Sequence, residues 1–172
     1  MLRILSLLLV LFPNRVMAQP ALSLLEQLVA LKYSAPQIEI DSFARRIASQ
    51  DRTRLLILDV RSPNEFAVSH IQDAIRVDPD ITGNGFARTF ADTIKGKDLI
   101  FYCSVGYRSS ILLARVQQHA LEAGAISLAN LRGGIFRWYN EQRPVVRYDA
   151  QVDTVHPYNA LWGQLLRKRD TF

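Results

Sequence analysis

The sequence predicts an α/β domain in which helices cover both faces of a central parallel sheet. Two runs of strand-forming residues, 55–61 and 99–103, are almost continuously apolar, which is typical of parallel strands buried on both faces. Strand-like and helix-like segments alternate along the chain, as they do in folds with parallel sheets. The length of 172 residues suits one domain, and with 49% hydrophobic and 22% charged residues the chain can form a full core.

The first 18 residues have the features of a secretory signal peptide. Arg3 precedes an apolar run over 4–12, Pro13 ends that run, and Val16-Met17-Ala18 offers a small-residue cleavage pattern. The run is too short to span a bilayer. We therefore expect cleavage after Ala18 and a periplasmic or secreted protein that meets the membrane only transiently. An uncleaved membrane anchor is the alternative.

The single cysteine, Cys103, constrains the chemistry of an exported protein. One cysteine cannot form an internal disulfide, so its free thiol is expected to have a chemical role. Loss of Arg3 and Arg15 with the signal peptide lowers the formal net charge from +5 to +3, which is too little for a nucleic-acid-binding protein. Three dispersed histidines and one cysteine form no ligand cluster, and no glycine-rich nucleotide motif follows the first strand. We expect neither a metal nor a cofactor.

A lead-in helix is expected over 20–33, within a segment, 19–36, that precedes the domain proper. Ser23 and Glu26 have capping-box spacing at its start. Leucines at helical spacing predict the apolar stripe that packs on the domain: Leu24, Leu25, Leu28 and Leu31. We assign no chemistry to this helix.

The domain proper, 37–146, is expected to begin with a strand over 37–40. A helix then runs to about Ser49, and Asp41 or Ser42 is expected to cap it.

The buried strand over 55–61 follows, and Pro63 marks the first turn of a short helix opened by residues 62–65, where its missing N–H costs nothing. A turn into a further strand is expected over 70–77.

Residues 78–98 are less informative. Asn84-Gly85 indicates a turn, and a helix over 86–94 is expected to end at Gly96.

The strand that ends on Cys103 runs into a short polar loop, 104–109, which opens a helix extending to Gly124. Such a loop presents unpaired backbone N–H groups, and the helix dipole adds partial positive charge. A thiolate at Cys103 would be stabilised by these dipoles and by Arg108. The arrangement predicts a nucleophile site, whereas a buried, unreactive cysteine is the alternative.

The remaining segments are a last strand over 125–131 and a C-terminal tail, 147–172, with a short helix. One face of that helix is expected to carry apolar residues: Leu161, Trp162, Leu165 and Leu166. We expect the tail to pack back onto the domain. Alternatively, Tyr158 and Trp162 shape the mouth of the active site or dock a partner.

Three segments resemble the rhodanese (sulfurtransferase) family. Cys-x-x-Gly-x-Arg at 103–108 resembles the active-site loop of that family. Asp-Val-Arg at 59–61, followed by Glu65-Phe66 and by His-Ile-x-x-Ala-Ile at 70–75, resembles the motif that precedes the active strand. Gly-Gly-x-x-x-Trp at 133–138 resembles a later segment. The resemblance covers about 37–146, as one unit without internal repeats.

The resemblance implies a rhodanese-like sulfurtransferase that moves sulfane sulfur from a donor such as thiosulfate to cyanide or a thiol, through a persulfide on Cys103 and with ping-pong kinetics. Cys103 and Arg108 are the expected catalytic residues. The loop residues are expected to bind the substrate: Ser104, Val105, Gly106, Tyr107, Arg108 and Ser109. The implied partners are a small sulfur-containing anion or a thiol, with a protein sulfur acceptor as a further candidate.

The other two motifs are mainly architectural in the family. We therefore expect Asp59 and Arg61 to form a structural charge pair, and His70 to hydrogen-bond neighbouring backbone rather than act as a general base. The glycines at 133–134 are expected to approach the loop, and Trp138 to lie in the core.

Two rival functions stay open. Cysteine phosphatases use the same strand–loop–helix arrangement, but with one more residue between the cysteine and the arginine. A non-catalytic binding module would not need both Cys103 and Arg108. One departure concerns the donor: many family members carry an arginine or lysine directly after the cysteine, where this chain has Ser104. Thiosulfate is then expected to be a poor donor, and the true donor less anionic or protein-bound.

Overall fold

The computed structural model describes residues 15–169. Its elements, in chain order, are α1 (Arg15–Lys32), β1 (Gln37–Ile38), α2 (Ile40–Ala48), the 3₁₀ helix η1 (Gln50–Arg54), β2 (Leu55–Asp59), α3 (Pro63–Val68), β3 (Ile75–Arg76), α4 (Gly83–Ile94), β4 (Asp98–Tyr102), α5 (Tyr107–Glu122), β5 (Ser127–Leu131), α6 (Gly134–Asn140), β6 (Val145–Arg147), β7 (Ala150–Val152) and α7 (Ala160–Gly163).

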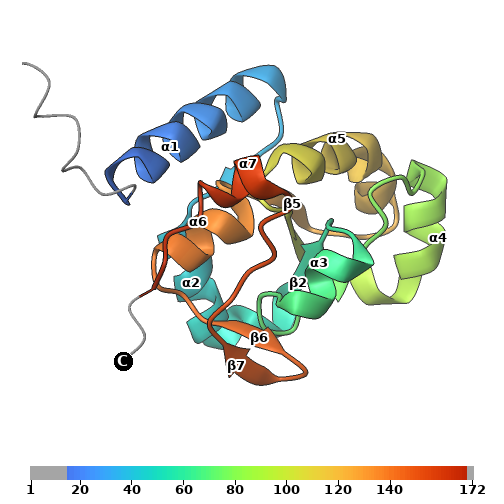
Figure 1. Ribbon diagram of the computed structural model, residues 1–172. Helices are drawn as coiled ribbons and strands as arrows, with labels where there is room; N and C mark the ends of the chain where they lie inside the picture. Colours follow the sequence, from blue (N-terminus) through green and yellow to red (C-terminus); the bar gives the residue numbers. More distant parts are fainter. Residues whose placement is uncertain (1–14, 170–172) are drawn as a thin grey trace, which may run out of the picture.

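The central sheet has the strand order β1-β5-β4-β2-β3, and every neighbouring pair is parallel, which confirms the predicted fold class. β4 lies in the middle, where its residue Phe101 pairs with Leu58 of β2 and Asn130 of β5. Because all five strands run the same way, their carboxyl ends lie at one edge of the sheet. The segments that follow β2, β4 and β5 therefore start close together. Figure 1 labels β2 and β5 of this sheet among the helices that surround it.

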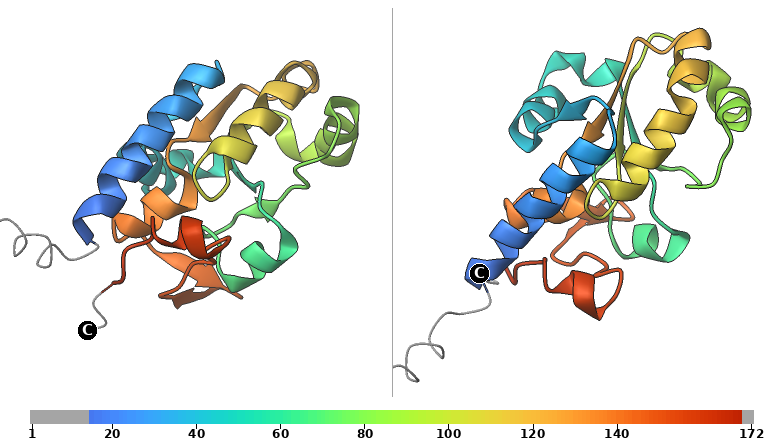
Figure 2. Two further views of the ribbon diagram at one scale, coloured as in Figure 1. Left: turned by 45° about the horizontal axis from the view of Figure 1, so that its top comes forward. Right: turned by 90° about the horizontal axis from the view of Figure 1, so that it is seen from above.

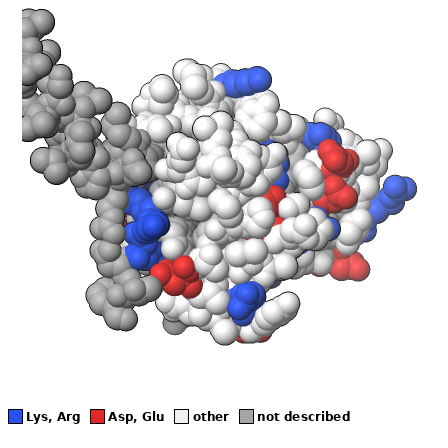
Figure 3. Space-filling view, in the orientation of Figure 1, with Lys and Arg blue, Asp and Glu red and all other residues white. Residues whose placement is uncertain are grey.

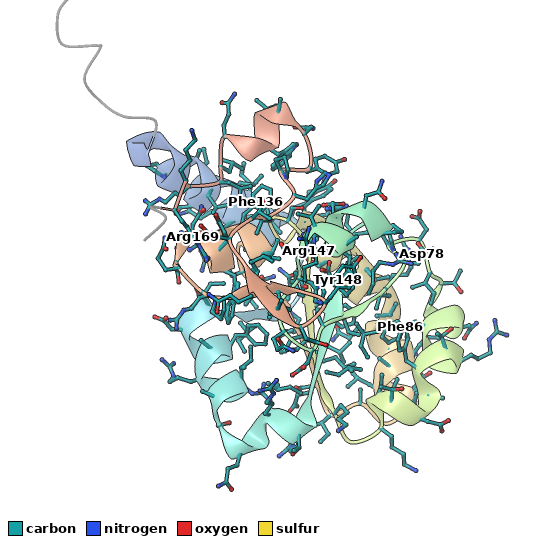
Figure 4. All side chains as sticks on the ribbon, turned by 60° about the horizontal axis from the view of Figure 1, so that its bottom comes forward. Asp78, Phe86, Phe136, Arg147, Tyr148 and Arg169 are labelled. Carbon is teal, nitrogen blue, oxygen red and sulfur yellow. The ribbon has the colours of Figure 1, made fainter. Side chains whose placement is uncertain are left out.

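Helices cover both faces of the sheet and close one apolar core on each (Figure 2). In β4, Ile100 and Tyr102 belong to the core beneath α2 and α6, whereas Leu99 and Phe101 belong to the core beneath α4 and α5. Successive side chains of a strand point to opposite faces, so a strand covered on both sides must be apolar throughout. Phe136 and Phe86, labelled in Figure 4, lie in these two cores.

Helix α1 packs on the domain with a different face from the one predicted. Leu24, Leu28 and Leu31 are exposed, so the predicted leucine stripe is wrong for these three residues. The buried face instead carries Leu22 and Glu26.

The buried face of α1 also brings a carboxylate close to two arginines. Glu26 lies 3.6 Å from Arg132 and 3.7 Å from Arg137, and a side chain at Gly133 would collide with it. Ser23 and Glu26 lie well inside the helix, which begins at Arg15, so they form no capping box.

Several helix starts test the predicted caps. Ser62 and Glu65 form the capping box that opens α3, with Pro63 at its first position. The helix α2 begins at Ile40, before Asp41 and Ser42, so the cap predicted there is wrong.

The turn predicted at Asn84-Gly85 is also wrong. Both residues lie in the first turn of α4, where the Thr82 hydroxyl accepts from the Gly85 N–H at 3.1 Å.

The prediction that residues 125–131 form the last strand is wrong, because two further strands follow β5. β6 and β7 form an antiparallel hairpin, with Arg147 and Tyr148 labelled in Figure 4. Its turn residues Tyr148 and Asp149 have φ of 49° and 63°, a conformation that Gly and Asn usually signal, so composition gave no indication of it. A bridge between His70 and Val146 joins the hairpin to the domain.

The predicted signal peptide falls mainly on residues 1–14, outside the described part of the chain. The helix α1 includes Ala18, the residue before the predicted cleavage point. Between residues 15 and 169, none of the helices has the length and apolar character needed to cross a membrane.

Candidate active site

The candidate nucleophile lies at the carboxyl edge of the sheet, directly after its central strand. β4 ends at Tyr102, Cys103 follows, and α5 begins at Tyr107. The turn between them is therefore only four residues long. Ligands of open parallel sheets bind outside this edge, where strand ends and helix starts meet.

The loop closes directly on the sulfur of Cys103. The Gly106 N–H donates to Sγ of Cys103 at 3.2 Å. Cys103 is buried, with 1% of its surface exposed. Gly106 has φ of 92°, a left-handed conformation that favours glycine, and a side chain there would press on Asn130. The loop therefore presents a backbone N–H donor directly to the sulfur.

The first residues of α6 donate backbone hydrogen bonds to the loop. Ile135 N–H donates to the Cys103 carbonyl at 2.9 Å, and Phe136 N–H donates to the Ser104 carbonyl at 3.0 Å. A side chain at Gly134 would collide with these two loop residues, so only glycine allows the approach. The predicted contact between this glycine segment and the loop is confirmed.

Arg108 is paired with Glu65, which the sequence analysis treated as architectural. The guanidinium donates to the two carboxylate oxygens at 2.8 and 2.7 Å, and to the Ser104 hydroxyl at 3.0 Å. The Ser104 hydroxyl in turn donates to Glu65 at 2.9 Å. The same carboxylate accepts from the Ser62 N–H at 3.0 Å as part of the capping box. Glu65 therefore serves the helix start and the site at once.

Both members of this pair are held in their charged forms. Burial alone would raise the pKa of Glu65, but hydrogen bonds from Arg108 and Ser62 lower it to about 2. Burial acts to lower the pKa of Arg108, yet Glu65 and Cys103 raise it above its ordinary value. Cys103 is thus within reach of a positive charge, but a carboxylate already neutralises that charge.

Acid should weaken the fold through Glu65. Its carboxyl has an ordinary pKa of 4.5 and a folded value of about 2, so its contribution is complete above pH 4.5 and is lost as the pH falls through about 2. We expect the free energy of unfolding of the wild type, measured with urea, to fall across this window. Glu65→Gln cannot titrate and should give a flatter profile. Glu122→Gln, at an exposed position on α5, should stay as steep as the wild type; equal profiles for all three proteins would contradict the prediction.

The C-terminal tail reaches the site through Tyr158. The guanidinium carbon of Arg108 lies 5.0 Å from the centre of the Tyr158 ring, and that ring meets the Trp162 ring edge-on at 6.4 Å. Asn140 secures the tail, because its amide donates to the Leu165 carbonyl at 2.7 Å and accepts from the Arg167 N–H at 2.8 Å.

The prediction that the tail packs back onto the domain is confirmed, whereas a role of Tyr158 and Trp162 at the mouth of the site or in docking a partner stays a prediction. Leu161, however, is exposed, in contrast to its predicted place in the apolar face.

The remaining loop residues do not converge on the sulfur through their side chains. Val105 is buried among apolar residues, and the Ser109 hydroxyl donates to Asn130 at 2.6 Å. Tyr107 is 40% exposed, and its ring meets that of Tyr33 at 5.6 Å. Any role of these residues in binding a donor would come from their backbone.

The Asp-Val-Arg motif forms a fully buried ion pair. Arg61 donates to Asp59 at 2.9 and 2.7 Å and to the Ser69 carbonyl at 2.6 Å. The Tyr102 hydroxyl donates to the same carboxylate at 2.6 Å, a contact that the sequence analysis missed. Burial, together with the charge of Asp59, raises the pKa of Tyr102 well above its ordinary value. The predicted structural charge pair is confirmed.

The histidine of the second motif also has the predicted structural role. His70 Nδ1 lies 3.2 Å from the Phe66 carbonyl, and its ring stacks on that of Phe66 at 4.0 Å. Over residues 15–169, no group of three or more histidine, cysteine or carboxylate side chains is placed to hold a metal ion.

Comparisons with known proteins agree with this architecture. Residues 39–141 match the family model for the rhodanese-like domain. A sulfurtransferase of Allochromatium vinosum is 30% identical over 110 residues, which cover 64% of this chain and 94% of that protein. The probable adenylyltransferase/sulfurtransferase MoeZ of Mycobacterium tuberculosis is 31% identical over 93 residues, but these cover only 22% of its length.

Solved structures share the fold. The BH2092 protein of Bacillus halodurans superposes with a TM-score of 0.58 at 20% identity, covering 85% of this chain and 98% of that one. A thiosulfate sulfurtransferase of Pseudomonas aeruginosa gives a TM-score of 0.53 at 20% identity, covering 76% of this chain and 23% of that one.

Proposed function

This chain belongs to the rhodanese-like family, and on that premise we propose that it is a sulfurtransferase that carries sulfane sulfur as a persulfide on Cys103. The observation that carries the proposal is the hydrogen bond from the Gly106 N–H to Sγ at 3.2 Å, within a loop that opens a helix. The sulfurtransferase of A. vinosum, which matches over nearly its whole length, supports the same activity.

In the first half-reaction, the Cys103 thiolate attacks the outer sulfur of the donor. A new S–S bond forms, the donor's own bond to that sulfur breaks, and the electron pair leaves with the remaining fragment. With thiosulfate as donor, the products are the Cys103 persulfide and sulfite. The Gly106 N–H donates to Sγ itself, and the positive end of α5 would stabilise the negative charge of the resulting persulfide.

In the second half-reaction, a nucleophile removes the outer sulfur and regenerates the Cys103 thiolate. Cyanide would leave as thiocyanate, and a thiol would leave as its own persulfide. Both half-reactions use the same sulfur atom in turn, so the kinetics are ping-pong. The reaction as proposed needs neither a metal nor a cofactor.

The partners we propose are a small sulfane donor and a thiol or protein acceptor. Because Cys103 is buried, the sulfur that an acceptor meets is the outer sulfur of the persulfide rather than Sγ itself. Export through residues 1–18, to the periplasm or the exterior, is a further part of this proposal, and it depends on the sequence pattern alone.

The decisive experiment is intact-protein mass spectrometry after exposure to a sulfane donor. One added sulfur atom, about 32 Da, is expected on persulfidation, and cyanide should remove it as thiocyanate. Hydrolysis of an aryl phosphate, assayed in parallel, tests the phosphatase alternative and should be absent. Phosphate hydrolysis without any gain in mass would overturn the proposal. Failure of both reactions would favour a non-catalytic module.

A further inference from the structure

The charges around Cys103 are unusual for a site that would receive a doubly charged donor. The Arg108 guanidinium interacts with the charge of Cys103, and Glu65 takes two of its hydrogen bonds at 2.8 and 2.7 Å. Ser104 takes a third at 3.0 Å and brings no charge of its own. The sulfur of Cys103 therefore faces an ion pair rather than a free cation.

Tyr158 covers Arg108 with an aromatic ring. The ring centre lies 5.0 Å from the guanidinium carbon, a distance at which the ring quadrupole attracts the cation. The side chain of Arg108 is only 25% exposed, and three of its five N–H groups are already donated to Glu65 and Ser104.

The conformation of the C-terminal tail fixes the position of Tyr158. Its backbone has φ of 65°, and its N–H donates to His156 Nδ1 at 3.0 Å. Asn159 then caps α7 by accepting from the Trp162 N–H at 3.0 Å. The turn therefore directs the ring onto Arg108, and the two aromatic rings stand together beside the site.

We propose that Tyr158 is a specificity-determining residue that, together with Glu65, withholds the Arg108 guanidinium from the donor. The site then prefers a singly charged sulfane donor with an apolar substituent over the doubly charged thiosulfate. This inference rests on the proposed sulfur transfer and names its donor class.

Charge repulsion and apolar contact both favour a singly charged donor with an apolar substituent. A second negative charge is repelled by the ionised Glu65 and by the thiolate, without a free guanidinium to offset it. An apolar substituent can lie against the half-exposed Tyr158 ring. The face drawn in Figure 3, over α1 and α7, carries few charged side chains, which suits the same kind of molecule.

Thiosulfate and methanethiosulfonate form a matched pair of donors, because one oxyanion of thiosulfate is replaced by a methyl group. With methanethiosulfonate, the Cys103 thiolate bonds to the outer sulfur, the bond between the two donor sulfurs breaks, and methanesulfinate leaves with the electron pair. With thiosulfate, sulfite leaves in the same way. Total charge is conserved in both reactions, and no oxidant or reductant is needed.

The test measures single-turnover loading of Cys103 by rapid quenching and mass spectrometry, with each donor on each variant. Rates with a small free thiol give the intrinsic reactivity ratio of the two donors. Relative to that ratio, we expect the wild type to favour methanethiosulfonate by at least about tenfold, as one unit of unscreened charge would produce. Tyr158→Ala should reduce this preference about fivefold, whereas Tyr158→Phe keeps the ring and should retain it.

Tyr148→Ala is the matched control, because Tyr148 is an exposed tyrosine that also has a positive φ but lies in the β6–β7 turn. It should behave as the wild type. Glu65→Gln frees the guanidinium from its counter-charge and should reduce the preference by about tenfold, mainly through faster loading by thiosulfate. Unfolding temperatures measured on all variants identify any that fail to fold.

Each outcome has a distinct meaning. A wild type that loads thiosulfate as readily as the free-thiol ratio predicts would overturn the inference while leaving sulfur transfer intact. Equal preferences in Tyr158→Ala and Tyr158→Phe would show that the ring does not set specificity. A wild type that gains sulfur from neither donor would remove the proposed function itself, and the inference with it.

Discussion

Replacement of Cys103 by serine is expected to abolish sulfur transfer while the protein stays folded. A hydroxyl is far too weakly acidic to attack sulfur, but it fits the same space and can accept the Gly106 N–H that Sγ accepts at 3.2 Å. Neither the gain of one sulfur atom nor release of thiocyanate should be detectable. The unfolding temperature should change by only a few degrees, because a hydrogen-bonded hydroxyl is tolerated in a buried position.

Ser110→Ala provides the control for this substitution. Ser110 is buried on α5, close to the loop, and its hydroxyl has no hydrogen-bond partner among the described residues. Its removal should leave sulfur uptake at the wild-type rate. Residual sulfur uptake by Cys103→Ser would mean that another group carries the sulfur. Because the chain has no other cysteine, this result would contradict the persulfide mechanism.

Removal of the Asp59 carboxylate should produce the largest loss of stability. Arg61 is fully buried, and Asp59→Ala leaves its charge unpaired, which costs about 3–5 kcal/mol in the free energy of unfolding. The Tyr102 hydroxyl loses its acceptor in the same variant. Urea unfolding at neutral pH measures the loss.

Asp41→Ala removes a carboxylate from an exposed pair with Arg143, at 2.6 Å, and serves as the comparison. We expect a cost of at most about 1 kcal/mol for it, as for other solvent-exposed pairs. A further variant, Asp59→Leu with Arg61→Met, should recover part of the loss because it leaves no charge unpaired. If Asp59→Ala and Asp41→Ala cost the same, the buried pair does not stabilise the fold.

The sequence predicts best where local pattern and burial coincide. β2 and β4 are buried on both faces, so their apolar runs identify them without ambiguity. The start of α3 at Pro63 and the strand–loop–helix around Cys103 each depend on a short continuous stretch. Features of this kind can be recognised from a short stretch of sequence alone.

Other features depend on contacts that no local pattern encodes. Glu65 and Arg108 are 43 residues apart, and Glu65 was predicted only as part of an architectural motif, so its contact with Arg108 was missed. Tyr158 lies in the C-terminal tail, and no local pattern there indicates its contact with Arg108. The predicted packing face of α1 was wrong because apolar residues occur around the whole helix: Leu22 and Val29 are buried, whereas three of the predicted leucines are exposed.

The two hydrogen bonds from α6 to the loop determine which way the loop's peptide groups face. In a trans peptide the N–H points opposite to the C=O. Because Ile135 and Phe136 bind the carbonyls of Cys103 and Ser104, the N–H groups of the next residues, Ser104 and Val105, must point away from α6. Rotating either peptide plane would break a hydrogen bond that is already made. The direction of these N–H groups is therefore set at folding, and in the proposed sulfur transfer the donor would meet a loop whose dipoles are already oriented.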